Sequence, residues 1–114
     1  MMEWINMISN TDSEIQDICV GESSLTVHVK LWNGTIRQVV FTDYYIYKDK
    51  RAIGEEIGDV IVDTKSALMD ELKQDTLDGG GTLEEIADVK SIVFYNAWND
   101  MVVLEVLAEE IEFL

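Results

Sequence analysis

The sequence predicts a single α+β domain spanning residues 1–114, built on a mainly antiparallel sheet of about five to seven strands, strongly curved or barrel-like, with one substantial helix near residues 65–77. Two turn-forming pairs, Asn33-Gly34 and Asn99-Asp100, each separate two runs rich in β-branched and aromatic residues, which is typical of hairpins. Only the stretch SALMDELKQDTL combines strong helix formers with a capping residue. The length of 114 residues fits one domain.

The first half of the chain predicts three strands. One covers about residues 14–20, after the turn formers in NTDS. The run SLTVHVKLW then alternates between apolar and polar residues, and TIRQVVF should return as its antiparallel partner. A two-residue type I′ turn at Asn33-Gly34 would fix the register and place two cations side by side. The expected cross-strand pairs are Lys30 with Arg37, Leu31 with Ile36, His28 with Val39 and Val27 with Val40.

The middle of the chain predicts short elements around one helix. DYYIYKDKR indicates a short aromatic strand, a loop containing Gly54 and Gly58 follows, and residues 60–62 indicate a short buried strand. The helix of residues 65–77 can be capped by Thr64 or Ser66, and its narrow apolar stripe predicts that it lies on the sheet with one face in water. The DGGG stretch ends it.

The C-terminal block can be interpreted in two ways. The run SIVFYNAWNDMVVLEVLAEEIEF indicates two strands around Asn99-Asp100, with apolar residues on both faces, which marks central strands of a sheet. Residues 100–113 also show helical spacing after a capping residue. The β-branched residues Val102, Val103 and Val106 favour strand.

Charge is distributed unevenly along the chain. The formal net charge is −15, with seven acids and five bases in residues 1–51 and sixteen acids and three bases in residues 52–114. Such a balance disfavours direct binding to nucleic acid or to anionic membranes and favours a basic protein partner. Residues 1–30 show no signal-peptide pattern and no stretch has membrane-spanning length, so we expect a cytoplasmic protein.

Signatures of catalysis and of metal or cofactor binding are missing from the sequence. No nucleophile elbow, Ser-His-Asp set, paired cysteine cluster or phosphate-binding loop is present, and the chain has one histidine. His28 and Cys19 lie on separate predicted strands without recognisable partners, so we expect no metal and no cofactor, and a buried, reduced Cys19. The sequence predicts a protein that is not an enzyme.

An acidic, proline-free domain of this kind resembles the small acidic β-rich immunity proteins that bacteria make against toxins. The segments that carry this resemblance are NTDSEIQDI, LTVHVKLWNG and AWNDMVVLEV. The resemblance implies an inhibitor that occludes the active site of a basic toxin such as a nuclease. Two other classes stay open: a homo-oligomeric structural or regulatory module, for instance a homodimer, and a small-ligand-binding domain. The candidate partner-binding residues are Asp70, Glu71, Asp75, Glu109, Glu110 and Glu112.

Overall fold

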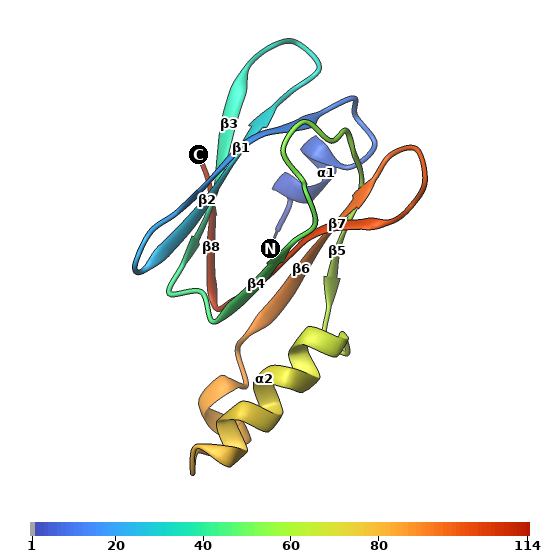
Figure 1. Ribbon diagram of the computed structural model, residues 1–114. Helices are drawn as coiled ribbons and strands as arrows, with labels where there is room; N and C mark the ends of the chain where they lie inside the picture. The colour runs from blue at the N-terminus through green and yellow to red at the C-terminus, as the bar shows by residue number, and fades with distance from the viewer. Residues whose placement is uncertain (1) are drawn as a thin grey trace.

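The computed structural model describes residues 2–114, which form two four-stranded antiparallel sheets and one long helix (Figure 1). Sheet A has the strand order β1-β2-β3-β8 and sheet B the order β4-β7-β6-β5. The strands are β1 (Glu14–Val20), β2 (Ser24–Lys30), β3 (Ile36–Thr42), β4 (Ile46–Asp49), β5 (Ile57–Asp63), β6 (Lys90–Asn96), β7 (Val102–Ala108) and β8 (Glu110–Phe113). The helices are α1 (Trp4–Ile8), α2 (Ala67–Asp78) and the 3₁₀ helix η1 (Leu83–Ile86).

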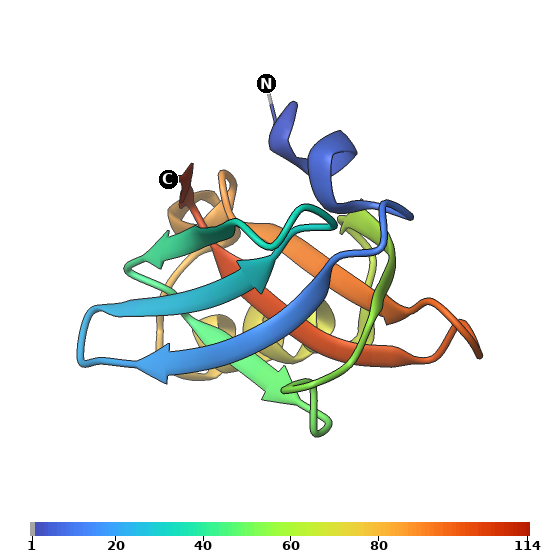
Figure 2. The same ribbon diagram turned by 90° about the horizontal axis from the view of Figure 1, so that it is seen from above.

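The predicted α+β class with mostly antiparallel strands is therefore confirmed, but two details of the prediction are wrong. Within residues 2–114 the strands number eight, and they divide between two sheets instead of forming one strongly curved or barrel-like sheet. The chain passes from sheet A to sheet B between β3 and β4, and it returns to sheet A at Glu109, between β7 and β8. Figure 2 shows the two sheets as separate layers.

The main hydrophobic core lies between the two sheets. Sheet A contributes residues such as Val27 and Phe41, and sheet B contributes Phe94 and Leu104, all fully buried. Trp4 and Ile8 of α1 join this core from one side. Burying such apolar surface is the main source of stability for a sandwich of this kind.

The helix packs on sheet B through a second, smaller core. Leu68, Met69 and Leu72 of α2 contact the segment around η1 and Leu107 of β7. The hydroxyl of Ser66 accepts a hydrogen bond of 3.1 Å from the Met69 N–H and so caps the first turn. The predicted helix, its Ser66 cap and its narrow buried stripe are confirmed.

The hairpin of β2 and β3 forms as predicted, but in a different register. Lys30 pairs with Ile36, and Val29 pairs with Arg37, one residue away from the expected pairing. Gly34 has a φ of 86°, and its N–H bonds to the Leu31 carbonyl, so the loop is a type I turn followed by a left-handed residue. The expected cation pair does not form, and His28 faces Gln38 instead of Val39.

The C-terminal block is strand, as its β-branched residues favour, and β6 and β7 are the two central strands of sheet B. The register again differs from the expected two-residue turn, because residues 97–101 form a longer loop and a bulge follows at Val103. Phe94 consequently pairs with Leu104 in the core, and Val93 with the buried Glu105 on the opposite face. Strand β5 is longer than expected, and its Ile61 and Val62 are exposed instead of buried.

Candidate functional site

The six acids singled out in the sequence lie on α2, on β8 and at the residue that precedes β8, and all six are exposed. Asp70, Glu71 and Asp75 project from α2, which packs on sheet B and lies below the sheets in Figure 1. Glu110 and Glu112 belong to β8 at the edge of sheet A. They alternate with Ile111 and Phe113, which pack against the core, so the two carboxylates lie on the outer face.

Glu109 is the third location. It occupies the corner between β7 and β8 and accepts a hydrogen bond of 2.9 Å from the Tyr45 hydroxyl. The six acids therefore lie on different elements, and all of them contribute to the negative field of the molecule.

A groove of about 210 Å³ lies at the loop end of the molecule, beside residues 97–101. We call it the Trp98 groove. Trp98 at its rim is 82% exposed, the largest exposed fraction among the large hydrophobic side chains within residues 2–114. The residues that line the groove are Asn10, Asp12, Glu56, Ile57, Ala97 and Trp98.

Hydrogen bonds fix the loop that carries Trp98. The side-chain oxygen of Asn96 accepts bonds from the N–H groups of Trp98 at 2.7 Å and Asn99 at 3.2 Å. The Ala97 N–H donates to the Glu56 carbonyl at 3.0 Å, which ties the loop to the opposite wall of the groove. The indole is therefore presented on a backbone that is already ordered.

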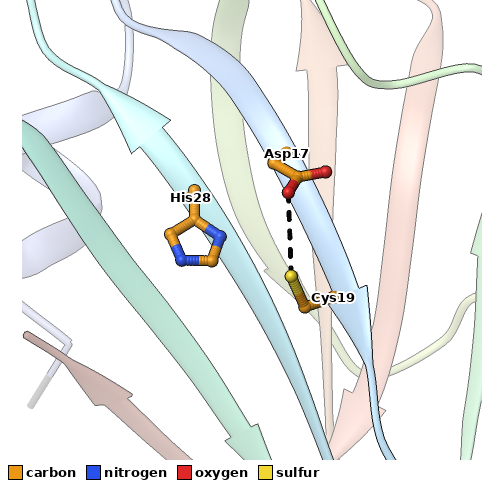
Figure 3. A group of neighbouring side chains, drawn as sticks. All are labelled: Asp17, Cys19 and His28. Atoms are coloured by element: carbon orange, nitrogen blue, oxygen red, sulfur yellow. Dashed lines mark hydrogen bonds between the residues drawn. The ribbon is translucent and has the colours of Figure 1, made fainter.

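A second cluster lies on the outer face of sheet A. Asp17 and Cys19 are two residues apart on β1 and project to the same side, and Asp17 is the cross-strand partner of His28 on β2 (Figure 3). One ligand atom from each of the three residues lies within 4.8 Å of the others. The Cys19 thiol donates a hydrogen bond of 3.7 Å to Asp17 Oδ2.

A bulge in β1 creates this cluster. Ile15 pairs with Val29, but the next paired residue is Asp17, opposite His28, so Gln16 is the extra residue. Without the bulge, Asp17 would pair with the buried Val27. With the bulge, Ile18 pairs with Val27 instead. The sequence expectation that His28 and Cys19 have no neighbours of ligand type does not hold in the fold, and Cys19 is exposed instead of buried.

The surroundings of Cys19 favour its protonated thiol. Desolvation by the surrounding protein atoms, followed by the charge and the hydrogen bond of Asp17, raises the pKa of this thiol. Without a cation in the cluster, Cys19 therefore has little of the thiolate character that nucleophilic cysteines require.

Comparison with protein-family models, with curated protein sequences and with solved structures found no match for this chain. Within residues 2–114, each helix is too short or too polar to cross a membrane.

Proposed function

We propose that the protein is a non-enzymatic, acidic protein-binding domain whose partner is a basic protein. The observation that carries this proposal is the Trp98 groove, which is lined by the 82% exposed Trp98 together with two acidic residues, Asp12 and Glu56. Among the residues that line the groove in the described part of the chain, none is a cation.

Tryptophan is the residue type most enriched at the centres of protein interfaces, because its large rigid side chain buries much apolar area at a small loss of side-chain entropy. Leaving an indole in water on an ordered loop gives a folded monomer no stability. Because two acidic residues line the same groove, the site favours a partner that offers an apolar pocket bordered by lysine or arginine.

The net charge of −15 acts over a longer distance than the groove. The exposed acids of α2 and of residues 109–112 would speed the encounter with a cationic surface without touching it in the final complex. In this proposal the groove makes the direct contact with the partner, and the remaining acids increase the rate at which the two proteins meet.

The resemblance to acidic immunity proteins supports a more specific form of the proposal. The basic partner would then be a toxin such as a nuclease, and carboxylates such as Asp12 and Glu56 would lie where the toxin binds substrate phosphates. The protein would inhibit by occlusion and would need no catalytic group of its own.

The test begins with capture of partners from a lysate of the host on immobilised protein, followed by purification of each recovered protein. Calorimetry then measures the dissociation constant of the purified pair. We expect a partner with a high isoelectric point and one-to-one binding. Trp98→Ala should weaken binding by about 30-fold, the effect of losing one central interface residue worth about 2 kcal/mol.

Matched controls distinguish binding at the Trp98 groove from nonspecific apolar binding and from nonspecific electrostatic attraction. Trp32→Ala removes another exposed indole, on the β2–β3 loop, and should leave the affinity unchanged. Asp12→Asn with Glu56→Gln should weaken binding more than Glu84→Gln with Glu85→Gln, which removes the same charge from exposed positions of η1. Equal affinities for wild type and Trp98→Ala, an acidic partner, or a homodimer that buries Trp98 would each contradict the proposal.

A further inference from the structure

We propose that Asp17, Cys19 and His28 form a site for a divalent transition-metal ion, with Zn²⁺ as the best match. This inference is independent of the proposed protein partner. It begins with the donor set, because one carboxylate oxygen, one thiol sulfur and one imidazole nitrogen are the three ligand types that proteins use for zinc.

The spacing fits a single ion. Bond lengths of about 2.0 Å to oxygen and 2.3 Å to sulfur place two ligands of a tetrahedral zinc about 3.5 Å apart. The observed separation of Asp17 Oδ2 and Cys19 Sγ is 3.7 Å. The three ligand atoms all lie within 4.8 Å of one another, so small side-chain rotations bring them onto one centre.

His28 gives a second and independent indication. Its Nδ1 atom is buried and has no hydrogen-bond partner. Figure 3 shows the imidazole ring beside Asp17 and Cys19, with a nitrogen on the edge that faces them. A buried polar atom without a partner destabilises a fold, and an ion bound among the three side chains would satisfy it.

The backbone holds the donors in place before an ion arrives. Asp17 and His28 are direct cross-strand partners, and Cys19 follows on the same face of β1 because of the bulge at Gln16. The Ile18 N–H donates a hydrogen bond of 2.9 Å to Asp17 Oδ1, which orients the carboxylate and leaves Oδ2 on the side of Cys19. Such an outer contact is typical of metal ligands.

Binding replaces one proton. The thiol of Cys19 loses its proton to water, and the sulfur lone pair forms the bond to the ion, so one Zn²⁺ enters as one H⁺ leaves. Asp17 and Cys19 are exposed, which leaves a fourth position open to water or to a group on another molecule.

The test titrates the purified, chelator-treated protein with ZnCl₂ by calorimetry in excess Mg²⁺, which occupies ordinary surface carboxylates. We expect one equivalent bound and a rise in the unfolding temperature with zinc. Loss of a residue that only hydrogen-bonds to a metal ligand weakens metal affinity by about 10–100-fold. Loss of a direct ligand should cost at least as much, so Cys19→Ser, Asp17→Asn and His28→Gln should each weaken zinc binding by at least about tenfold. Co²⁺ in place of Zn²⁺ should give a thiolate charge-transfer band in the near ultraviolet that Cys19→Ser abolishes.

The matched control is Glu22→Gln, which removes an exposed carboxylate near β1 but outside the cluster and should bind zinc like wild type. Circular dichroism of each variant checks folding, and the exposed positions 17 and 19 keep the test valid if His28→Gln misfolds. The absence of a one-to-one site, or equal zinc affinity in wild type and Cys19→Ser, would overturn the proposal.

Discussion

The hydroxyl of Tyr45 donates a hydrogen bond of 2.9 Å to the carboxylate of Glu109, at the corner where the chain passes from sheet B to sheet A. The Tyr45 N–H also binds the Leu107 carbonyl at 2.8 Å. The segment before β4 is thus fastened to the end of β7, next to the step that divides the strands between two sheets.

This contact should be visible in the titration of Tyr45. The hydrogen bond to Glu109, followed by desolvation and the nearby carboxylate charges, raises the pKa of the phenol. Because the pKa is raised in the folded state, the contact stabilises the fold fully below the unfolded pKa of about 10. This stabilisation is lost as the pH rises through the pKa of Tyr45 in the folded protein. We expect Glu109→Gln to lower the pKa of Tyr45, measured as tyrosinate absorbance with Tyr45→Phe as the reference. Glu112→Gln should have little effect, and a Tyr45 pKa that is the same in Glu109→Gln as in wild type would contradict this assignment.

The acids at the C-terminal end should act on association rates. Changing Glu109, Glu110 and Glu112 together to glutamine should slow association with a basic partner at low salt, because exposed charges steer encounter. The difference should shrink near 0.15 M salt, where screening shortens to about 8 Å. Stopped-flow mixing at two salt concentrations measures both rates. Folding should stay nearly intact, and equal rates for wild type and the triple variant at low salt would mean that these acids only solubilise the protein.

The Asp17–Cys19 contact predicts a slow thiol in the metal-free protein. Because Asp17 contributes to the raised pKa of Cys19, Asp17→Asn should increase the thiolate fraction and hence the rate of reaction with a disulfide reagent at mildly alkaline pH. Glu22→Gln is the control and should react like wild type. An unchanged rate in Asp17→Asn would show that the carboxylate does not act on the thiol.

Gly58 is required by close packing beneath the Trp98 groove. A Cβ atom at this position would lie 2.9 Å from the Cα of Ala97 and 3.1 Å from the Asn96 carbonyl oxygen, both backbone atoms. We expect Gly58→Ala to lower the free energy of unfolding by about 1–3 kcal/mol, as overpacking does. In Gly79→Ala the added Cβ atom would lie 3.4 Å from the Asp75 carbonyl oxygen, which is an ordinary contact. The free energy of unfolding of this variant should therefore differ from that of wild type by no more than about 0.5 kcal/mol. Urea unfolding compares the two variants, and equal stabilities would contradict the packing at Gly58.

Local chemistry determined several elements from the sequence alone. Strand β1 occupies the predicted residues 14–20, the helix begins at its Ser66 cap, and the segment with the β-branched residues Val102, Val103 and Val106 forms a strand despite its helical spacing. These features depend on side chains and backbone within a few residues of one another, so pattern and propensity are enough to find them. The exposure of Glu109, Glu110 and Glu112 also follows from their position beyond the apolar run.

Cross-strand register was decided by the tertiary structure. The pair Asn33-Gly34 indicates a turn, but the same residues fit a two-residue and a three-residue loop, and the difference of one residue exchanges the partners of every side chain in the hairpin. The fold takes the loop that pairs Val27 with Val39 and Leu25 with Phe41, because all four side chains are then buried between the sheets.

The same physics explains why the sequence did not reveal the Asp17–Cys19–His28 cluster. A bulge interrupts the ladder of hydrogen bonds and is stable only when tertiary packing compensates for that loss. Here the compensation is the packing of Ile18 against the core, opposite Val27, and the residue pattern of β1 by itself does not show it. That choice turns Asp17 and Cys19 outward beside His28. The sequence thus determined where most of the strands lie and where charge accumulates, whereas the burial of apolar side chains between two sheets decided which polar residues meet on the surface.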